Sequence, residues 1–112
     1  IFDFYKGELG SLDGVEFITV NEWNEPNYWL SVMTLSGKVR PLDIMEALEK
    51  ENIESRPVWK PMHMQPYFEK YDYIGTDVSE KLFENGVCLP SDTKMADEDL
   101  YRVVNIIKGL WV

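Results

Sequence analysis

Four segments of the chain are predicted to be helices, and three of them have apolar residues at the spacing of an amphipathic helix. The segment 41–52 opens with a proline, which suits the first turn of a helix, and closes with an asparagine, which suits its end. The segment 78–85 follows Asp77, a suitable N-cap, and ends at an asparagine–glycine pair that tolerates the left-handed conformation. The other two helical segments are residues 1–9 and a helix that starts near Asp97 with an acidic first turn. The predicted apolar stripes consist of Phe2, Tyr5 and Leu9 in the first helix, Pro41, Ile44, Met45 and Leu48 in the second, and Leu100, Val103, Val104 and Ile107 in the last.

Short apolar runs lie between these helices and predict β-strands. Residues 60–76 are expected to be irregular, because two prolines there remove backbone hydrogen-bond donors. The fold class is therefore α/β: a two-layer sandwich of a small three- to four-stranded sheet with about three helices on one side. The second strand, the helix after it and the third strand fit a crossover unit, but this pattern leaves the strand order open. The predicted strands cover residues 15–20, 28–35, 53–59 and 87–90.

The composition narrows the class of protein. A chain of 112 residues fits one domain, and no apolar run approaches the ~20 residues of a membrane span. Twenty acidic against eleven basic residues give a net charge of −9, which disfavours nucleic acid and anionic membranes as partners. One cysteine and no visible signal peptide favour the cytoplasm, and a single cysteine with a single histidine argues against a structural zinc site. Because the chain begins with Ile1 and not with methionine, we expect a fragment of a larger parent.

Residues 55–68, SRPVWKPMHMQPYF, contain no acidic residue although the chain is strongly acidic. Arg56, Lys60 and His63 lie within eight residues of one another, separated by prolines and Trp59 that stiffen the backbone. Such a group is suited to binding an anion, since arginine grips a carboxylate or phosphate through two parallel hydrogen bonds. The alternative is structural: the arginine pairs with a helix glutamate, the histidine is an internal hydrogen-bonding group, and Trp59 packs. The residues alone slightly favour the structural alternative.

No other part of the sequence forms a complete active site. Cys88 lies between two apolar residues in a predicted buried strand, where its thiol is protonated and inert, so we expect it to pack in the core. The glycines are scattered and form no phosphate-binding loop or nucleophile elbow. Catalytic, cofactor-binding and metal-binding residues are therefore not assigned to this chain.

Two long runs, NIESRPVWKPMHMQPYF and VSEKLFENGVCLPSDTKMADEDLYRVVNIIK, closely resemble the C-terminal end of the DegT/DnrJ/EryC1/StrS family of pyridoxal phosphate-dependent sugar aminotransferases. With the strand NYWLSVMTL, the resemblance covers roughly residues 27 to 108. It implies the small C-terminal domain of a fold type I transferase, with residues 27–112 as its core and residues 1–26 as the joint with an absent large domain. One departure is Ala96, which stands where family members are expected to have a serine or threonine cap.

The resemblance implies that the parent converts a nucleotide-linked keto sugar into an amino sugar, with an amino acid such as glutamate as the donor. Pyridoxal phosphate would be bound by a lysine of the absent domain, because none of the eight lysines here has the family context of that residue. This chain alone is therefore not expected to be active. Its implied part is to close one wall of the substrate cleft, with the substrate facing Arg56 and His63, together with Trp59 and Lys60. The parent is expected to be a homodimer.

A different class of function stays open at this point. The chain would then be a stand-alone acidic binding or interaction module that performs no catalysis. Its contact surface would be the segment NEWNEPNYW or the proline-rich stretch. A pyridoxal spectrum in the whole protein distinguishes the two hypotheses.

Overall fold

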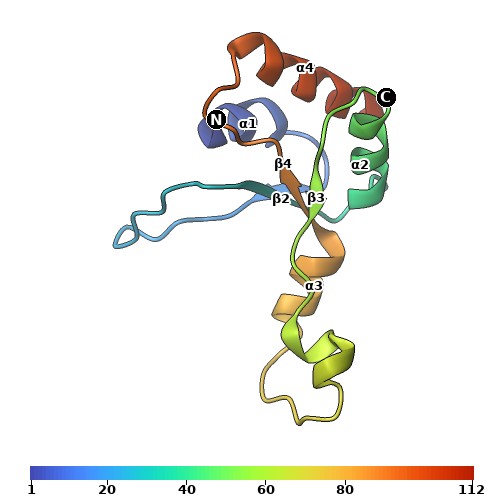
Figure 1. Cartoon of the computed structure of the whole chain (residues 1–112). Coiled ribbons are helices and arrows are strands. Elements are labelled where there is room, and N and C mark those ends of the chain that lie inside the picture. The colour runs from blue at the N-terminus through green and yellow to red at the C-terminus, as the bar shows by residue number, and fades with distance from the viewer.

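The computed structural model describes all 112 residues and contains one antiparallel sheet of four strands in the order β1-β2-β4-β3. Three helices, α1, α2 and α4, cover one face of the sheet, as Figure 1 shows. The predicted α/β fold is confirmed, with all four predicted helices present and three of them on one face of the sheet. The strands are β1 (Val15–Phe17), β2 (Ser31–Leu35), β3 (Arg56–Pro57) and β4 (Gly86–Leu89). The helices are α1 (Phe2–Leu9), α2 (Pro41–Glu49), α3 (Val78–Asn85) and α4 (Asp97–Lys108).

The core lies between the sheet and these three helices. The predicted stripes of α1 and α4 are buried there, and Ile44 and Leu48 of α2 are fully buried with them. The Tyr5 hydroxyl donates a 2.8 Å hydrogen bond to the carbonyl oxygen of Pro90, so the buried polar end of this side chain is satisfied. The thirteen core residues are Tyr5, Leu9, Val15, Met33, Leu35, Ile44, Leu48, Val87, Leu89, Leu100, Val103, Val104 and Ile107. Residues from both sides of the predicted boundary at 26/27 share this core.

The helix ends follow local chemistry. After α2, Asn52 adopts the left-handed conformation with φ 57, and the Ile53 amide donates to the Leu48 carbonyl, which satisfies the end of the helix. The final helix starts at Asp97 as predicted, although Ala96 has no capping side chain. Instead, the Ala96 amide donates to the Asp99 carboxylate at 3.0 Å, which ties the residue before the helix to its first turn.

Three predicted strands are longer than the observed ones. β2 begins at Ser31 and not at residue 28, because Tyr28 has a positive φ of 50 and the Trp29 amide donates to the Asn27 side chain. β1 ends at Phe17, and β3 contains two residues, of which Pro57 has no amide to donate. β2 and β3 both pair antiparallel with β4, so they are parallel to each other and α2 crosses over between them.

Gly86 corrects a prediction about the end of α3. The asparagine–glycine pair was expected to favour the left-handed conformation, but Gly86 is extended, with φ −97 and ψ 147, and begins β4 directly. A side chain there would collide with Val58 and with the Leu82 carbonyl. The glycine is needed for close packing and not for a special backbone angle.

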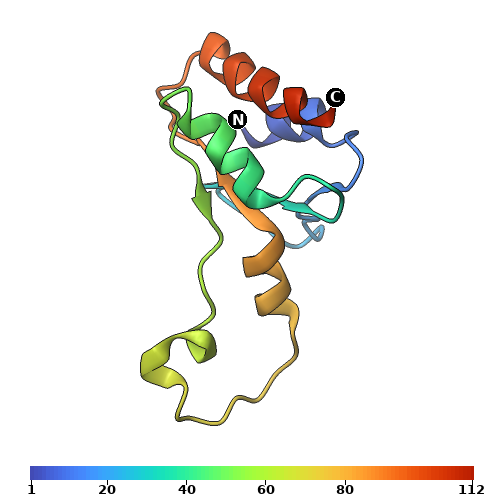
Figure 2. The same ribbon diagram turned by 90° about the vertical axis from the view of Figure 1, so that its right-hand side faces the viewer.

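Two segments project from this body; Figure 1 shows both, and Figure 2 shows the lower one from another side. The arm, residues 18–30, connects β1 to β2, and the lobe, residues 60–77, connects β3 to α3. The lobe contains no α-helix, as predicted, but has 3₁₀ turns at Met62–Met64 and Pro66–Phe68, and none of its residues is buried. None of the helices combines the length and apolar character needed to cross a membrane.

Candidate functional site

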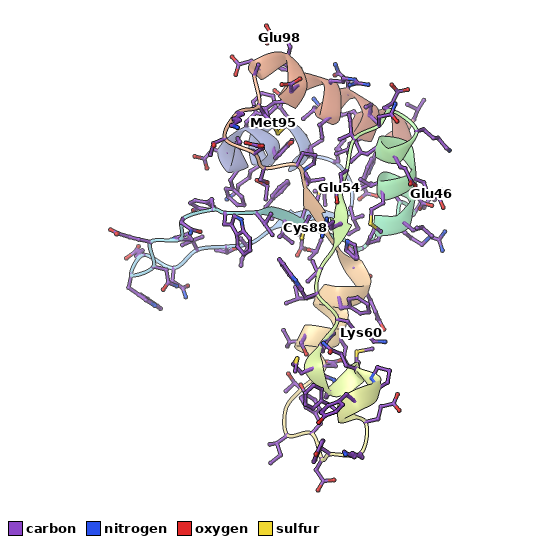
Figure 3. All side chains as sticks on the ribbon, in the orientation of Figure 1. Glu46, Glu54, Lys60, Cys88, Met95 and Glu98 are labelled. Atoms are coloured by element: carbon purple, nitrogen blue, oxygen red, sulfur yellow. The ribbon has the colours of Figure 1, made fainter.

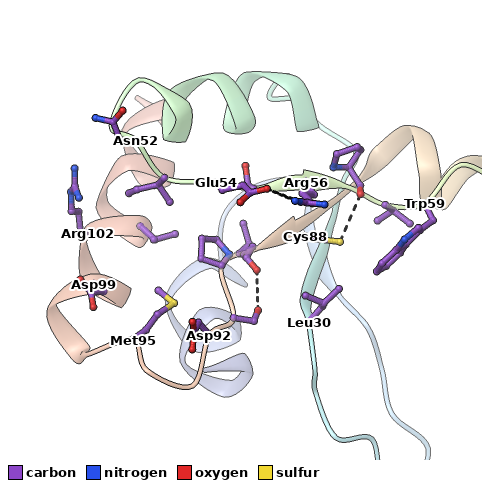
Figure 4. A pocket seen from close by; sticks show the side chains of 18 of the residues that line it. Leu30, Asn52, Glu54, Arg56, Trp59, Cys88, Asp92, Met95, Asp99 and Arg102 are labelled. Atoms are coloured by element: carbon purple, nitrogen blue, oxygen red, sulfur yellow. Dashed lines mark hydrogen bonds and ion pairs between the residues drawn. The ribbon is translucent and has the colours of Figure 1, made fainter.

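The largest hollow lies where β3 and β4 separate. The two strands pair only at Arg56–Cys88 and Pro57–Val87, so residues 52–55 diverge from residues 89–92 and leave an opening between them. Its volume is about 810 Å³, and Figure 4 shows it from close by. This fork hollow is lined by residues 52–60 and 88–92, with Leu30, Phe83, Met95, Asp99, Arg102 and Val103.

The structure brings three of the four predicted site residues to this hollow. Arg56, Trp59 and Lys60 line it, because they follow one another along β3 and the segment that leaves it. Figure 3 shows Lys60 below the sheet, where the chain enters the lobe. His63 lies farther along the chain and lines a different hollow. The roles of all four residues in substrate binding stay predictions.

Arg56 has an acidic partner that the sequence analysis missed. Its Nε donates to Glu54 Oε1 at 2.7 Å, while the arginine side chain keeps 75% of its surface exposed. The signal was present in the sequence, because residues two apart in an extended segment project to the same side. An exposed pair of this kind contributes at most about 1 kcal/mol, so a ligand carboxylate or phosphate would replace Glu54 at small cost.

The charges around the fork hollow are balanced. Three bases line it, and three acids line it as well, so the surface is less cationic than residues 55–68 alone indicate. Arg102 donates to the Glu51 carbonyl at 2.9 Å, which joins α4 to the end of α2. The bases are Arg56, Lys60 and Arg102, and the acids are Glu54, Asp92 and Asp99.

Cys88 lies in the fork hollow as part of the fully buried strand β4. Burial raises the pKa of its thiol, and its Sγ lies 3.9 Å from the Pro57 carbonyl oxygen. A protonated, poorly exposed thiol is a weak nucleophile. Cys88 is buried as predicted, but it lines the fork hollow and is not one of the thirteen residues of the main core.

His63 is held by two neighbours inside the chain. Its Nε2 lies 2.8 Å from Glu80 Oε1 of α3, and its ring stacks on Tyr73 with the centroids 3.6 Å apart. The side chain is 18% exposed. These contacts fit the structural alternative for this histidine, since they fasten the lobe to α3.

A second hollow of about 470 Å³ lies in the lobe, and its lining was not predicted. The signal is compositional, because four of the seven residues from Tyr67 to Tyr73 are aromatic. A segment with no helical or strand period gave no reason to expect those rings to converge. This aromatic hollow is lined by Met62, His63, Tyr67, Phe68, Tyr71, Asp72 and Tyr73.

No lysine of this chain is enclosed in the way expected of the lysine that binds pyridoxal phosphate. A lysine that binds this cofactor as a Schiff base acts through its uncharged amine, which enclosure favours. Seven of the eight lysines are exposed, and the eighth, Lys108, pairs with Glu8 at 2.6 Å. Lys60 is the lysine that lines the fork hollow, and it is exposed as well. That the cofactor is bound by a lysine outside this chain stays a prediction.

Comparison with known proteins gives consistent matches over nearly the whole chain. EpsN of Bacillus subtilis, named as a pyridoxal phosphate-dependent aminotransferase, is 42% identical over 115 residues, covering 99% of this chain and 30% of the relative. The GDP-perosamine synthase of Vibrio cholerae is 28% identical, covering 97% of this chain and 30% of the relative. This chain thus spans about 30% of the length of the curated relatives it matches.

The fold is also shared with solved structures. The sugar aminotransferase CalS13 from Micromonospora echinospora superposes with a TM-score of 0.81 at 21% identity, covering 98% of this chain and 29% of that one. The profile of the DegT/DnrJ/EryC1/StrS aminotransferase family matches residues 1–108. The chain belongs to the DegT/DnrJ/EryC1/StrS aminotransferase family.

Proposed function

We propose that this chain is the C-terminal small domain of a pyridoxal phosphate-dependent aminotransferase. The parent would make an amino sugar from a nucleotide-linked keto sugar, with an amino acid such as glutamate as the donor. The observation that carries this proposal is the family match over residues 1–108, together with 42% identity to EpsN across the chain. The similarity to a GDP-perosamine synthase supports a nucleotide-linked sugar as the substrate.

In this proposal the domain closes one wall of the substrate cleft, and the fork hollow faces the substrate. Arg56 would bind the carboxylate of the donor or the diphosphate of the sugar nucleotide, with Lys60 as a second cation. Trp59 is 64% exposed and lies 6.4 Å from Trp29 between ring centroids, so the two indoles offer an apolar wall. His63 would approach the same substrate from the lobe. Pyridoxal phosphate would be held by residues outside this chain.

The same proposal places the parent in the cytoplasm as a homodimer. A single buried cysteine supports a reducing compartment, because such a chain gains nothing from disulfide formation. Light scattering of the purified whole protein measures its mass in solution and tests the dimer directly.

The proposal is tested on the whole protein that contains this chain. After incubation with pyridoxal phosphate, addition of glutamate should produce the absorbance change that accompanies conversion of the cofactor to pyridoxamine phosphate. A nucleotide-linked keto sugar should then reverse the change and yield an amino sugar, detected by mass spectrometry. A protein without a pyridoxal spectrum would contradict the proposal and favour a binding module that performs no catalysis.

Replacing Arg56 with alanine tests the role of the fork hollow. Loss of one charge-assisted hydrogen bond of about 1.5–3 kcal/mol should lower kcat/KM by about 10- to 100-fold. Arg40→Ala is the matched control, because Arg40 is an exposed arginine that pairs with Asp43 outside the fork hollow. Equal kcat/KM values for the two variants would mean that Arg56 has a structural role and does not bind the substrate.

A further inference from the structure

The aromatic hollow has one wall that is already fixed in place. The rings of His63 and Tyr73 are stacked with an interplanar angle of 14°. His63 is held by Glu80, and the Tyr73 hydroxyl donates to the Thr76 carbonyl at 2.8 Å. Both rings are held by hydrogen bonds at their polar ends. A planar ligand would therefore bind to side chains that are already ordered, and little conformational entropy would be lost on binding.

The other wall consists of exposed aromatic rings. Tyr67 and Tyr71 are 72% and 58% exposed, and Phe68 packs edge-on against Tyr67 with centroids 5.0 Å apart. Exposed apolar side chains gathered around a hollow are typical of a binding surface. Aromatic rings bind nucleobases by stacking, since every base presents a planar π-face.

The polar groups at this hollow point to one class of base. Asp72 lines the hollow and has neither a hydrogen bond nor an ion pair within the chain, so both of its oxygens are available to accept. Guanine presents two adjacent N–H donors on its pairing edge, which match a carboxylate. Uracil and thymine present one donor between two carbonyl oxygens, and these oxygens repel a carboxylate.

A cation lies at the rim of the same hollow. The Nζ of Lys70 is 5.6 Å from the ring centroid of Tyr67 and 5.2 Å from that of Tyr71. It is held over the tyrosine rings and makes no ion pair with an acidic side chain. Its charge therefore stays available to the phosphates that follow a base bound in the hollow.

We propose that the aromatic hollow binds the guanine of a guanosine diphosphate-linked sugar, with Asp72 as the residue that selects the base. This inference rests on the proposed function and adds to it the nucleotide class and the place where the base is held. With the diphosphate near Lys70, Arg56 in the fork hollow would bind the carboxylate of the amino donor. Tyr67 and Tyr71 stack on the base, Asp72 accepts from its N–H groups, and Lys70 contacts the diphosphate.

The test measures binding of GDP and of UDP to the whole protein by calorimetry, without any reaction. The unchanged protein should bind GDP about 10-fold more tightly than UDP, the range expected for one well-placed hydrogen-bonded pair. Asp72→Asn should bring the two affinities within about 3-fold of each other, because the amide both donates and accepts. Glu69→Gln is the matched control, since Glu69 is an exposed acid of the lobe outside the hollow, and it should keep the preference.

A second substitution tests stacking independently of base choice. Tyr71→Ala should weaken GDP and UDP alike, by about 10-fold. Ile74→Ala should leave both affinities unchanged, because Ile74 is 98% exposed and does not line the hollow. Equal affinity of the unchanged protein for GDP and UDP, or a preference that survives Asp72→Asn, overturns this inference alone. Intact GDP preference without amino transfer from glutamate overturns the proposed function alone.

Discussion

The body of the molecule and the lobe are stabilised in opposite ways. The body buries thirteen residues between the sheet and α1, α2 and α4, whereas the lobe, residues 60–77, buries none. The lobe relies instead on short-range hydrogen bonds, such as Met64 N–H to the Pro61 carbonyl, and on side-chain pairs with α3, such as His63 with Glu80. In Figure 2 the lobe lies away from the core, beyond the segment that follows β3 and beyond α3.

Stability and ligand recognition therefore depend on different parts of this chain. Fully burying one large apolar side chain contributes about 1.5–3 kcal/mol, while a hydrogen bond contributes about 0.5–1.5 kcal/mol net. Ordering the lobe nevertheless costs little conformational entropy, because Pro61 and Pro66 already restrict the unfolded chain. A segment held this way keeps its aromatic rings available to a ligand, which the body cannot do.

The largest expected effect comes from breaking the body. Leu48→Ala removes a fully buried side chain of α2 from the core and should lower the free energy of unfolding by about 2–5 kcal/mol. Tyr67→Ala, a larger truncation in the lobe, should change it by less than about 0.5 kcal/mol. Urea denaturation followed by circular dichroism measures both. Similar losses for the two variants would abolish the distinction between body and lobe.

A change of pH acts on the body through one buried phenol. Burial raises the pKa of Tyr5 well above its ordinary value, so the unfolded chain loses this proton first as the pH rises. The free energy of unfolding should therefore fall above about pH 10, by up to about 1.4 kcal/mol per pH unit. Below that pH the contribution of Tyr5 is fully present.

Tyr5→Phe separates this slope from other alkaline effects. The variant loses the hydrogen bond to Pro90, which costs about 1–2 kcal/mol, but it has no phenol to ionise. Its stability should decline less steeply than that of the unchanged chain in urea titrations between about pH 9 and about pH 11. The buried Cys88 thiol, whose pKa is also raised, contributes equally to both proteins. Parallel curves would show that Tyr5 is not the group responsible.

The smallest expected effect concerns the attachment of the lobe. Glu80→Gln removes the charge opposite His63 and should speed amide hydrogen exchange at Met64 and Phe68, whose amides close the two 3₁₀ turns. The global free energy of unfolding should change by less than about 0.5 kcal/mol. Glu84→Gln, an exposed acid of the same helix without a partner, should leave lobe exchange unchanged. Unaltered exchange in both variants would mean that the pair does not hold the lobe.

The sequence was most informative where structure depends on local spacing. The stripe of α4 and the position of Leu48 follow from the 3.6-residue period, because a helix places such residues on one face whatever it packs against. Strand limits were less predictable, since pairing partners are distant in the chain. β2 lies opposite β4, more than fifty residues later, and this register decides that Ser31 is its first paired residue.

The candidate site was likewise predictable only where it depends on residues that are close in sequence. Arg56, Trp59 and Lys60 could be grouped from their closeness in sequence, and a stiff extended segment does bring them to one hollow. The partner Glu54 was missed although it lies two residues before Arg56 in an extended segment, a spacing that puts both side chains on the same side. Glu80 was missed because nothing in the proline-rich stretch marks which distant acid turns toward it. The aromatic hollow was missed because turns without a regular period do not reveal which way their side chains point.

The sequence by itself determined the α/β class, the helices and their buried faces, and the family to which the chain belongs, because all of these depend on residue order and local backbone preference. Only the tertiary structure decided the strand order, the fork between β3 and β4, and the separation of His63 from Arg56. Those features depend on contacts between residues far apart in the chain. The free energy of such contacts comes from packing between distant segments, so no single stretch of the sequence indicates them.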